Sequence, residues 1–335
     1  MSAPGLLVTA SPHLSAKAST PTIMWNVIGS LVPIVIVSIY LFRISALLVL
    51  AASVAGALLP ERIWSRVGAV RDGSALITGI LLALTLPPGI PIWMAFAGAF
   101  FGVAFGKLVF GGLGQNPFNP ALLGRAFLQA AFPVALTTWP LPGGNWLAFK
   151  GDTLALPLMS ANAPDAVTAA TPLGLMKFEH TSTSLFDLFL GFTGGTLGET
   201  SAALVLICGG YLAWRRFLEW RIPASIFATV ALLSGLFFLI DPARYPNPLF
   251  MLLSGGLMLG AVFMATDMVT SPTTHKGCWI FGVGIGALVV VIRLWGGLAE
   301  GVMYAILLMN ALVPFINRWT QPTLFGSRKK VDVAS

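Results

Sequence analysis

The sequence is poor in charged residues, which make up only 9% of its 335 positions. A soluble domain carries about 25% charged residues, because polar side chains must cover its surface. This shortage excludes a soluble cytosolic enzyme, a disordered scaffold and a nucleic-acid-binding module. The chain is instead 56% hydrophobic and has a mean hydropathy of +0.87, which indicates a polytopic membrane protein.

Cysteine and histidine are also scarce, and their positions exclude several kinds of site. Cys208 and Cys278 lie in apolar stretches and form neither a disulfide framework nor a metal-ligand spacing. His13, His180 and His275 fall outside the predicted helices, whereas a membrane haem needs paired histidines within helices. We therefore expect no metal site and no haem. The first twenty residues contain no long apolar run, so no cleaved signal is expected.

Apolar stretches of membrane-helix length recur along the chain. About 20 apolar residues span a bilayer as a helix, and the sequence predicts about ten such segments, at 22–42, 44–60, 74–87, 91–110, 120–136, 197–214, 223–240, 247–265, 277–294 and 300–317. The third is short and ends at Pro87-Pro88-Gly89, which predicts a half-helix or a tilted one. The apolar stretch 184–192 is too short to span. We expect an all-α membrane protein with one integral domain over 1–335.

Basic residues indicate on which side of the membrane each loop lies. They cluster after the second, sixth and tenth segments, at Arg62, Arg66, Arg71, Arg215, Arg216, Arg221, Arg318, Arg328, Lys329 and Lys330. Because basic residues collect in cytoplasmic loops, ten helices with both termini inside place every cluster in the cytoplasm. The predicted order is a cytoplasmic N-terminus (1–21), helices one to five (22–136), an outer segment (137–196), helices six to ten (197–317) and a cytoplasmic tail (318–335).

A short internal echo suggests a repeat. Phe110-Gly111-Gly112-Leu113 precedes the fifth segment and Trp295-Gly296-Gly297-Leu298 precedes the tenth, and each of these segments ends near a proline, Pro133 or Pro314. The expected topology puts the two echoes on opposite faces of the membrane. This arrangement predicts two inverted repeats of five helices, with broken or half-helices, as in many transport folds.

The outer segment contains Asp165-Ala-Val-Thr168-Ala-Ala-Thr171-Pro172. Pro172 biases Thr171 toward an extended backbone, which presents its hydroxyl outward. Taken alone, the stretch is an Ala/Thr loop before a proline. It also resembles the flavinylation motif Asp-x-x-(Ser/Thr)-(Gly/Ala)-Ala-Thr, in which the last threonine carries FMN through a phosphoester bond. The resemblance implies FMN on Thr171, with Asp165 and Thr168 supporting its geometry or its attachment.

Two Asn-Pro pairs interrupt the chain before the fifth segment. The carboxamides of Asn116 and Asn119 donate and accept hydrogen bonds, so they are candidates to bind the edge of an isoalloxazine ring. The alternative for Asn119 is an ordinary helix start, with Asn119 as N-cap and Pro120 in the first turn. Arg125, one turn further on, either contacts a flavin or a carboxylate or extends to the inner surface.

Glycines and hydroxyl residues precede the sixth segment, in Gly194-Gly-Thr-Leu-Gly-Glu199-Thr200-Ser201. Backbone N–H groups at a helix N-terminus bind anions, which makes Glu199 and Thr200 candidates for contacts with a flavin phosphate. The alternative places Glu199 in the first helical turn, where it complements the helix dipole.

Other charged residues lie at or near the ends of the predicted helices. Asp267 is either solvated in its loop or a contact to a second cofactor or an ion pathway. Lys107, Arg293 and Glu300 are expected to extend toward the membrane surface.

Several segments, in order, together resemble one family over nearly the whole chain. The family comprises the D subunit of Rnf ion-translocating oxidoreductases and the B subunit of sodium-translocating NADH:quinone reductases. The matching segments are Ser11-Pro-His13, Thr22-Ile-Met24, Asp72-Gly-Ser-Ala75, Gly114-Gln-Asn-Pro-Phe-Asn-Pro120, Gly124-Arg-Ala-Phe-Leu128, Ala131-Phe-Pro133, the Thr171 motif, Gly198-Glu-Thr-Ser201 and Ala265-Thr-Asp267. The B subunit usually has a longer N-terminal region, so the Rnf type is favoured.

The resemblance implies a multi-pass subunit of the bacterial inner membrane. The implied complex has six subunits, including iron–sulfur and flavin proteins, passes electrons between ferredoxin and NAD, and moves sodium ions or protons. The resemblance also implies covalent FMN on Thr171 facing outward, attached by a flavin transferase, and riboflavin toward the cytoplasm near Asn116 and Asn119. A lipid-embedded channel or transporter for a small solute, without a cofactor, is the alternative of another class.

Overall fold

The computed structural model describes residues 18–64, 72–157, 171–179, 181, 183–191, 194–199, 201–242 and 244–322. These ranges are helical and contain no β-strand. The first group of elements is α1 (Thr20–Trp64), α2 (Ser74–Thr85), α3 (Ile92–Val103), the π-helical turn η2 (Ala104–Leu108), α4 (Pro120–Ala131) and α5 (Pro133–Thr137). The segment 137–196 contributes α6 (Pro172–Gly174), η3 (Leu175–Glu179) and α7 (Leu185–Leu190). The last group is α8 (Ala202–Trp214), α9 (Arg221–Ile240), α10 (Pro248–Leu253), α11 (Leu257–Leu259), η4 (Gly260–Met264), α12 (His275–Trp295) and α13 (Val302–Thr320).

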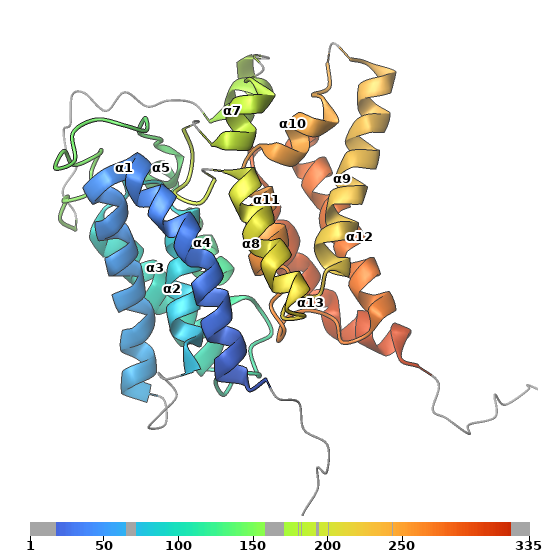
Figure 1. The fold of residues 1–335 in the computed structure, drawn as a ribbon, viewed down its shortest axis with the longest axis horizontal. Coiled ribbons are helices and arrows are strands. Elements are labelled where there is room, and N and C mark those ends of the chain that lie inside the picture. Colours follow the sequence, from blue (N-terminus) through green and yellow to red (C-terminus); the bar gives the residue numbers. More distant parts are fainter. Residues whose placement is uncertain are drawn as a thin grey trace, which may run out of the picture.

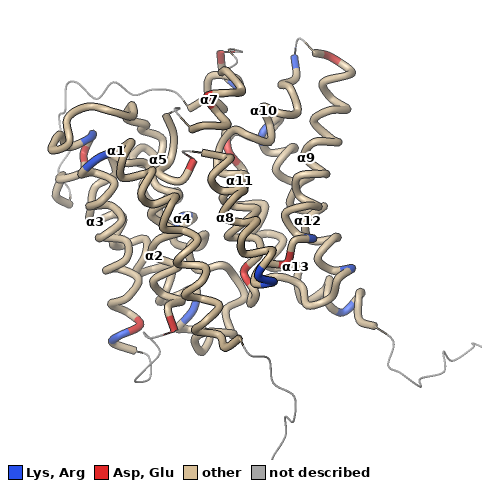
Figure 2. The backbone as a smooth tube through the Cα atoms, in the orientation of Figure 1, with Lys and Arg blue, Asp and Glu red and all other residues tan. Residues whose placement is uncertain are grey.

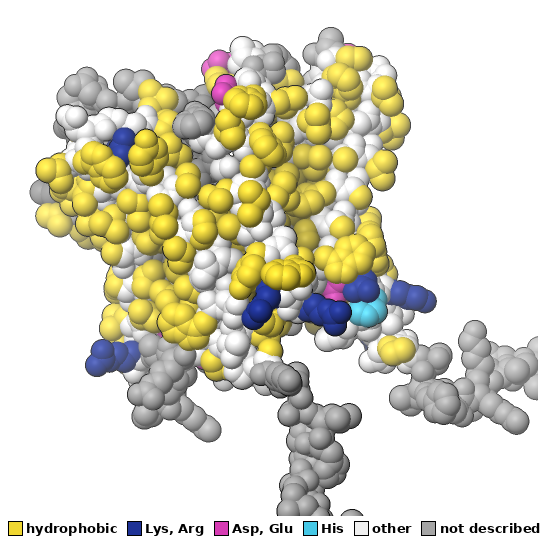
Figure 3. Space-filling model, viewed as in Figure 1, with side chains coloured by type: hydrophobic (Ala, Val, Ile, Leu, Met, Phe, Trp, Pro, Cys, Tyr) yellow, Lys and Arg dark blue, Asp and Glu magenta, His cyan; other side chains and the backbone are white. Residues whose placement is uncertain are grey.

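Four helices, α1, α9, α12 and α13, are long and apolar enough to cross a membrane, and α2, α3–η2 and α8 are shorter apolar helices. Most charged residues lie toward the two ends of the helices (Figure 2). On the face shown in Figure 3, a broad hydrophobic band lies above a row of basic side chains. Such an exposed apolar surface is typical of contact with lipid or partner proteins. The predicted all-helical membrane architecture is therefore confirmed for the described ranges.

The first long helix is two antiparallel helices joined at Arg43 (Figure 1). Arg43 has a φ of 60°, outside the helical range. Its guanidinium lies over the rings of Tyr40 and Trp146, at 4.9 and 4.3 Å from their centroids. The boundary predicted between segments 22–42 and 44–60 is confirmed. The start of α1 and the end of α13 lie at the same, lower end of the molecule in Figure 1.

The chain leaves the helical conformation at two places within apolar segments, after α2 and between α10 and α11. α2 ends at Thr85, and Leu86 is already extended, which confirms the break predicted before Pro87. The backbone N–H groups of Leu197 and Gly198 donate to the carbonyls of Leu86 and Leu84, at 3.0 and 2.6 Å. The second break separates α10 from α11. Irregular backbone at membrane depth needs such internal hydrogen-bond partners.

The helices form two groups that meet in the middle (Figure 1). α1 packs against α2 and α3, and α3 packs against α4, whereas α12 packs against α9 and α13. α8 contacts α1, and α13 contacts α4, so these two pairs join the groups. One correction concerns the tenth predicted segment: Pro314 lies inside α13, which continues to Thr320.

Glycines allow α3 and α4 to pack with their backbones close together. A Cβ added at Gly124 would lie 2.4 Å from the carbonyl oxygen of Gly98, and one at Gly102 would lie 2.4 Å from that of Pro120. Both distances are far below van der Waals contact, so any larger residue must push the helices apart.

We expect Gly124→Ala to destabilise the protein by about 1–3 kcal/mol through overpacking, measured as a lower midpoint of thermal unfolding in detergent. Gly210→Ala is the matched control, because Gly210 is helical and an added Cβ there meets nothing within 4 Å. An equal loss in both variants would show that the α3–α4 contact is not the cause.

Candidate functional site

Two cavities lie on opposite sides of the α11–η4 segment. The Asn116 cavity is near the starts of α1 and α2 and has about 780 Å³ unfilled by protein atoms, including its open mouth. The Thr171 cavity is near the end of α2 and the α12–α13 connection and has about 980 Å³ by the same measure. The two cavities contain five of the predicted site residues.

Thr171 lies at the edge of the second cavity and begins α6. Its backbone is extended, with φ −66° and ψ 153°, as Pro172 predicted. Its Oγ1 accepts a hydrogen bond of 3.1 Å from the N–H of Gly174, so the hydroxyl caps its own turn. Leu173 packs against Leu188 and Phe250 in a small apolar cluster. The predicted Asp165 and Thr168 lie outside the described residues, as does Thr200.

Lys177, six residues after Thr171, fastens this segment to the rest of the fold. Its Nζ donates to the carbonyl oxygens of Ile292, Gly296 and Leu298, at 3.3, 2.6 and 2.8 Å. These carbonyls belong to the end of α12 and the turn that follows, where a cation is favourable. Partial burial lowers the pKa of Lys177. The contact fixes the Thr171 segment beside the α12–α13 connection.

A salt bridge crosses the Thr171 cavity between the two helix groups. Arg125 on α4 contacts Glu300, with Nη2 3.3 Å from Oε2, and Glu300 also accepts a hydrogen bond from the N–H of Gly256. The contact with a carboxylate predicted for Arg125 is confirmed. The alternative, extension of Arg125 to the inner surface, is wrong, because its side chain is only 12% exposed and its guanidinium is paired. Glu300 is likewise paired instead of extending to the surface.

Glu199 lines the same cavity, from the loop that pairs with the α2 break. α8 begins only at Ala202 and is capped by Ser201, whose side chain accepts from Leu204 N–H. The interpretation of Glu199 as a first-turn residue is therefore wrong. Its Oε2 accepts a 3.4 Å hydrogen bond from the N–H of Thr196, which turns the carboxylate toward its own loop.

Arg293 supports the break between α10 and α11. It is 4% exposed, and it donates to the carbonyls of Met251 and Ser254, at 2.5 and 3.0 Å. These are carbonyls at the end of α10, which lose their helical partners where the helix stops. The prediction that Arg293 extends to the membrane surface is wrong, because a nearby helix end supplies its partners inside the protein.

Asn119 is the N-cap that its position predicted, and it also ties α4 to η4. Its Oδ1 accepts from the N–H groups of Ala121 and Leu122, at 3.0 and 3.4 Å, as the N-cap of α4. Its Nδ2 donates 3.1 Å to the carbonyl of Met264, which ties the start of α4 to η4. Because both ends of its carboxamide have protein partners, Asn119 shapes the Asn116 cavity more than it offers a free group to a ligand.

Asn116 keeps an acceptor free in its cavity. The residue is 5% exposed; its Nδ2 donates to the carbonyl of Phe118 at 3.3 Å, and its Oδ1 is buried without a hydrogen-bond partner. Leaving a buried acceptor unsatisfied costs about 1–3 kcal/mol. A ligand with an N–H donor at this position would remove that cost.

Lys107 is a cavity residue whose partner the sequence did not reveal. It is 3% exposed and lines the Asn116 cavity together with Asp267. Its Nζ lies 2.5 Å from Oε1 of Glu61 and 2.6 Å from Oγ of Ser74. The prediction that Lys107 extends to the surface is therefore wrong. Asp267 accepts from Thr270 Oγ1 at 3.2 Å.

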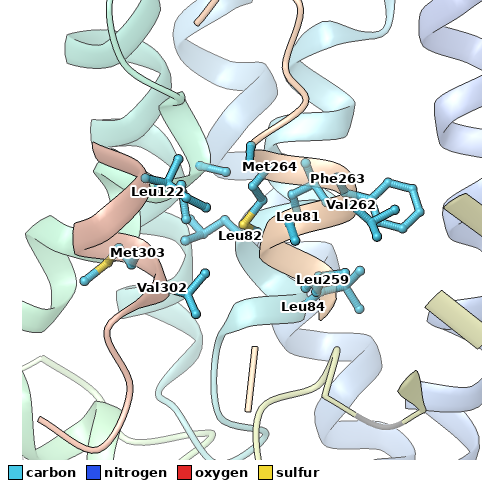
Figure 4. Close-up of a cluster of buried hydrophobic side chains, with 14 of the residues drawn as sticks. Leu81, Leu82, Leu84, Leu122, Leu259, Val262, Phe263, Met264, Val302 and Met303 are labelled. Atoms are coloured by element: carbon cyan, nitrogen blue, oxygen red, sulfur yellow. The ribbon is translucent and has the colours of Figure 1, made fainter. Parts of the chain in front are cut away.

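Buried apolar side chains pack into a layer, drawn as the cluster in Figure 4, and its members line one cavity or the other. Leu81, Val262 and Phe263 line the Asn116 cavity. The side facing the Thr171 cavity is formed by Leu122, Leu259, Met264, Val302 and Met303. η4 contributes residues to both sides. The apolar layer therefore lies between the cavity that contains Asn116 and the cavity that contains Thr171.

We expect Lys177→Met to loosen the Thr171 segment, because three carbonyls lose a charged donor. Amide exchange at Leu175, whose N–H donates to the Thr171 carbonyl, should accelerate about tenfold, as hydrogen bonds to charged groups contribute roughly 1.5–3 kcal/mol. Hydrogen–deuterium exchange of the peptide covering 171–179 measures this. Lys276→Met, at an exposed position, is the charge-matched control; equal exchange in both variants would contradict the anchoring role.

Comparison with known proteins identifies one family and several D subunits of related complexes. Residues 7–326 match the NQR2, RnfD, RnfE family. The chain is 41% identical, over 96% of both chains, to the D subunit of the proton-translocating ferredoxin:NAD(+) oxidoreductase complex of Clostridium ljungdahlii. It is 42% identical to the D subunit of the ion-translocating oxidoreductase complex of Stutzerimonas stutzeri, over 92% of this chain and 93% of that one. It is 41% identical to the D subunit of the Na(+)-translocating ferredoxin:NAD(+) oxidoreductase complex of Acetobacterium woodii, over 97% and 96%.

These matches cover almost the whole chain and confirm the resemblance seen in its motifs. The chain belongs to the NQR2, RnfD, RnfE family.

Proposed function

We propose that the chain is the flavin-bearing membrane subunit of a ferredoxin:NAD oxidoreductase complex of Rnf type, in which electron transfer drives ion translocation. FMN is esterified to Thr171, and a second flavin, riboflavin, occupies the Asn116 cavity. One observation carries the proposal: the threonine of the flavinylation motif lines one cavity, the Asn-Pro residues line another, and an apolar layer lies between them. The names of the relatives supply the type of complex.

The residues present fit a flavin at each position. Thr171 supplies the hydroxyl that a phosphoester needs, and the charged side chains of Arg125, Glu199 and Glu300 line the same cavity. In the other cavity the free Oδ1 of Asn116 accepts an N–H donor, and an isoalloxazine ring has such a donor. A bound flavin exchanges one or two electrons; the protein contributes position, exclusion of water and local charge.

The proposed topology has ten membrane crossings. They are the two parts of α1, then α2, α3–η2, α4–α5, α8, α9, α10–α11–η4, α12 and α13. The breaks in the third and eighth crossings fall at matching positions of two five-helix halves, which favours the inverted repeat. Arg62, Arg215 and Arg318 end α1, α8 and α13, so the positive-inside rule makes their side cytoplasmic and the Thr171 side external.

The proposed partners follow from the complex. They are membrane and peripheral subunits that carry iron–sulfur clusters and flavins, a flavin transferase that acts on Thr171 during maturation, and the lipid of the bacterial inner membrane. The exposed apolar side chains of α9, including Leu232, Leu236 and Leu239, are suited to lipid or to a neighbouring membrane subunit.

Thr171→Val tests the covalent flavin. The wild-type chain, produced with the transferase, should give a flavin-fluorescent band in a denaturing gel and the mass of one attached FMN. The variant should lose both completely, because valine has no hydroxyl to esterify. Thr137→Val is the matched control, since Thr137 lines the same cavity and should keep the label. An unlabelled wild-type chain would instead support a cofactor-free solute transporter.

Asn116→Leu tests the second flavin. We expect about tenfold weaker retention of the non-covalent flavin, because the variant removes the free acceptor at a cost of roughly 1–3 kcal/mol in binding. The measurement is the flavin released on denaturation, per mole of protein, from Thr171→Val chains that carry no covalent FMN. Asn145→Leu, at an exposed position, is the control. Unchanged retention in Asn116→Leu would place the second flavin elsewhere.

A further inference from the structure

The ion pair of Lys107 and Glu61 is buried, and stabilisation of the fold alone does not explain its presence there. Glu61 on α1 is 1% exposed and Lys107 is 3% exposed. Ser74 accepts a second hydrogen bond from Lys107 and donates to Asp72. Removing two charges from water costs several kcal/mol per ion, and apolar residues of similar volume often stabilise such a position better.

The two members of the pair lie differently with respect to the Asn116 cavity. Lys107 and Ser74 are part of its wall, whereas Glu61 is not among the residues that line it. Glu61 therefore stands behind the ammonium, and its second oxygen, Oε2, is buried without a partner. Of the described residues that line this cavity, Lys107 and Asp267 are the charged ones. The ammonium is thus the positive charge that a molecule in the cavity meets.

We infer that Lys107 raises the reduction potential of the flavin in the Asn116 cavity, and that Glu61 limits this effect as its counter-charge. The inference rests on the proposed function. Reduction of an isoalloxazine adds electrons and negative charge to the ring system, so a fixed cation on the cavity wall favours the reduced form. Burial strengthens the effect, because charge interactions are weakly screened away from water. Charges beside the ring are among the means by which proteins tune flavins.

The experiment compares two variants that differ only in the ammonium. Glu61→Gln removes the counter-charge and keeps Lys107. The double variant Glu61→Gln/Lys107→Met also removes the cation, and it leaves no unpaired buried charge that would prevent folding. Both are made in the full chain with Thr171→Val, so that the non-covalent flavin is the one titrated. Its midpoint potential is measured by absorbance during reductive titration.

We expect Glu61→Gln to raise the midpoint potential above that of the parent. The double variant should lie below Glu61→Gln by at least a tenfold change in the reduction equilibrium constant, which is about 30 mV for two electrons. Lys276→Met removes the same charge from an exposed position and should leave the potential unchanged. Asp267, the other charged residue of the cavity wall, is intact in every chain.

The outcomes separate the inference from the proposed function. If the parent chain retains no flavin, the proposed second flavin is wrong and the inference is wrong with it. If flavin is retained and the two variants have the same potential, the inference alone is overturned. If only the double variant loses its flavin, Lys107 is a binding residue instead of a tuning residue, which also overturns the inference as stated.

Discussion

Backbone groups inside a membrane need hydrogen-bond partners from the protein itself, and this requirement explains where the irregular segments lie. The end of α2 is paired by the backbone N–H groups of Leu197 and Gly198. The end of α10 is satisfied by Arg293, and the start of α11 by Glu300. At each break, a segment distant in the sequence thus supplies the missing hydrogen-bond partners. The Thr171 cavity lies where these segments meet.

The charged residues beside the cavities therefore both hold backbone segments in place and set the local charge. Glu300 accepts the Gly256 N–H and pairs with Arg125, so the same carboxylate holds a helix break and joins the two helix groups. Lys177 binds the carbonyls at the end of α12 and positions the segment that begins at Thr171. A change in charge within the Thr171 cavity acts directly on Glu300, because this side chain both lines the cavity and accepts the hydrogen bond from Gly256 N–H.

Single residues in the sequence predicted the features of the backbone that depend only on neighbouring residues. Pro87 predicted the end of α2, Pro172 the extended Thr171, and Asn119 the start of α4. Such residues did not predict which side chains far apart in the sequence pair with one another. Lys107 and Glu61 are separated by 46 positions, and nothing near either residue shows that an opposite charge faces it. A charge near the end of an apolar segment is consistent with both a surface position and a buried pair; only the packing of α1 against η2 decides between them.

The apolar layer between the cavities is a much greater barrier to an ion than to electron transfer. Electron transfer does not require a continuous polar path, whereas an ion that enters hydrocarbon unpaired meets a large desolvation cost. Buried side chains of η4, α2, α4 and α13 pack against one another in this layer (Figure 4). η4 is held from one side by Asn119 at the carbonyl of Met264, and α11, which precedes it, follows the break held by Glu300. A displacement of α11–η4 must therefore alter both cavities at once, since the same short segment forms a wall of each.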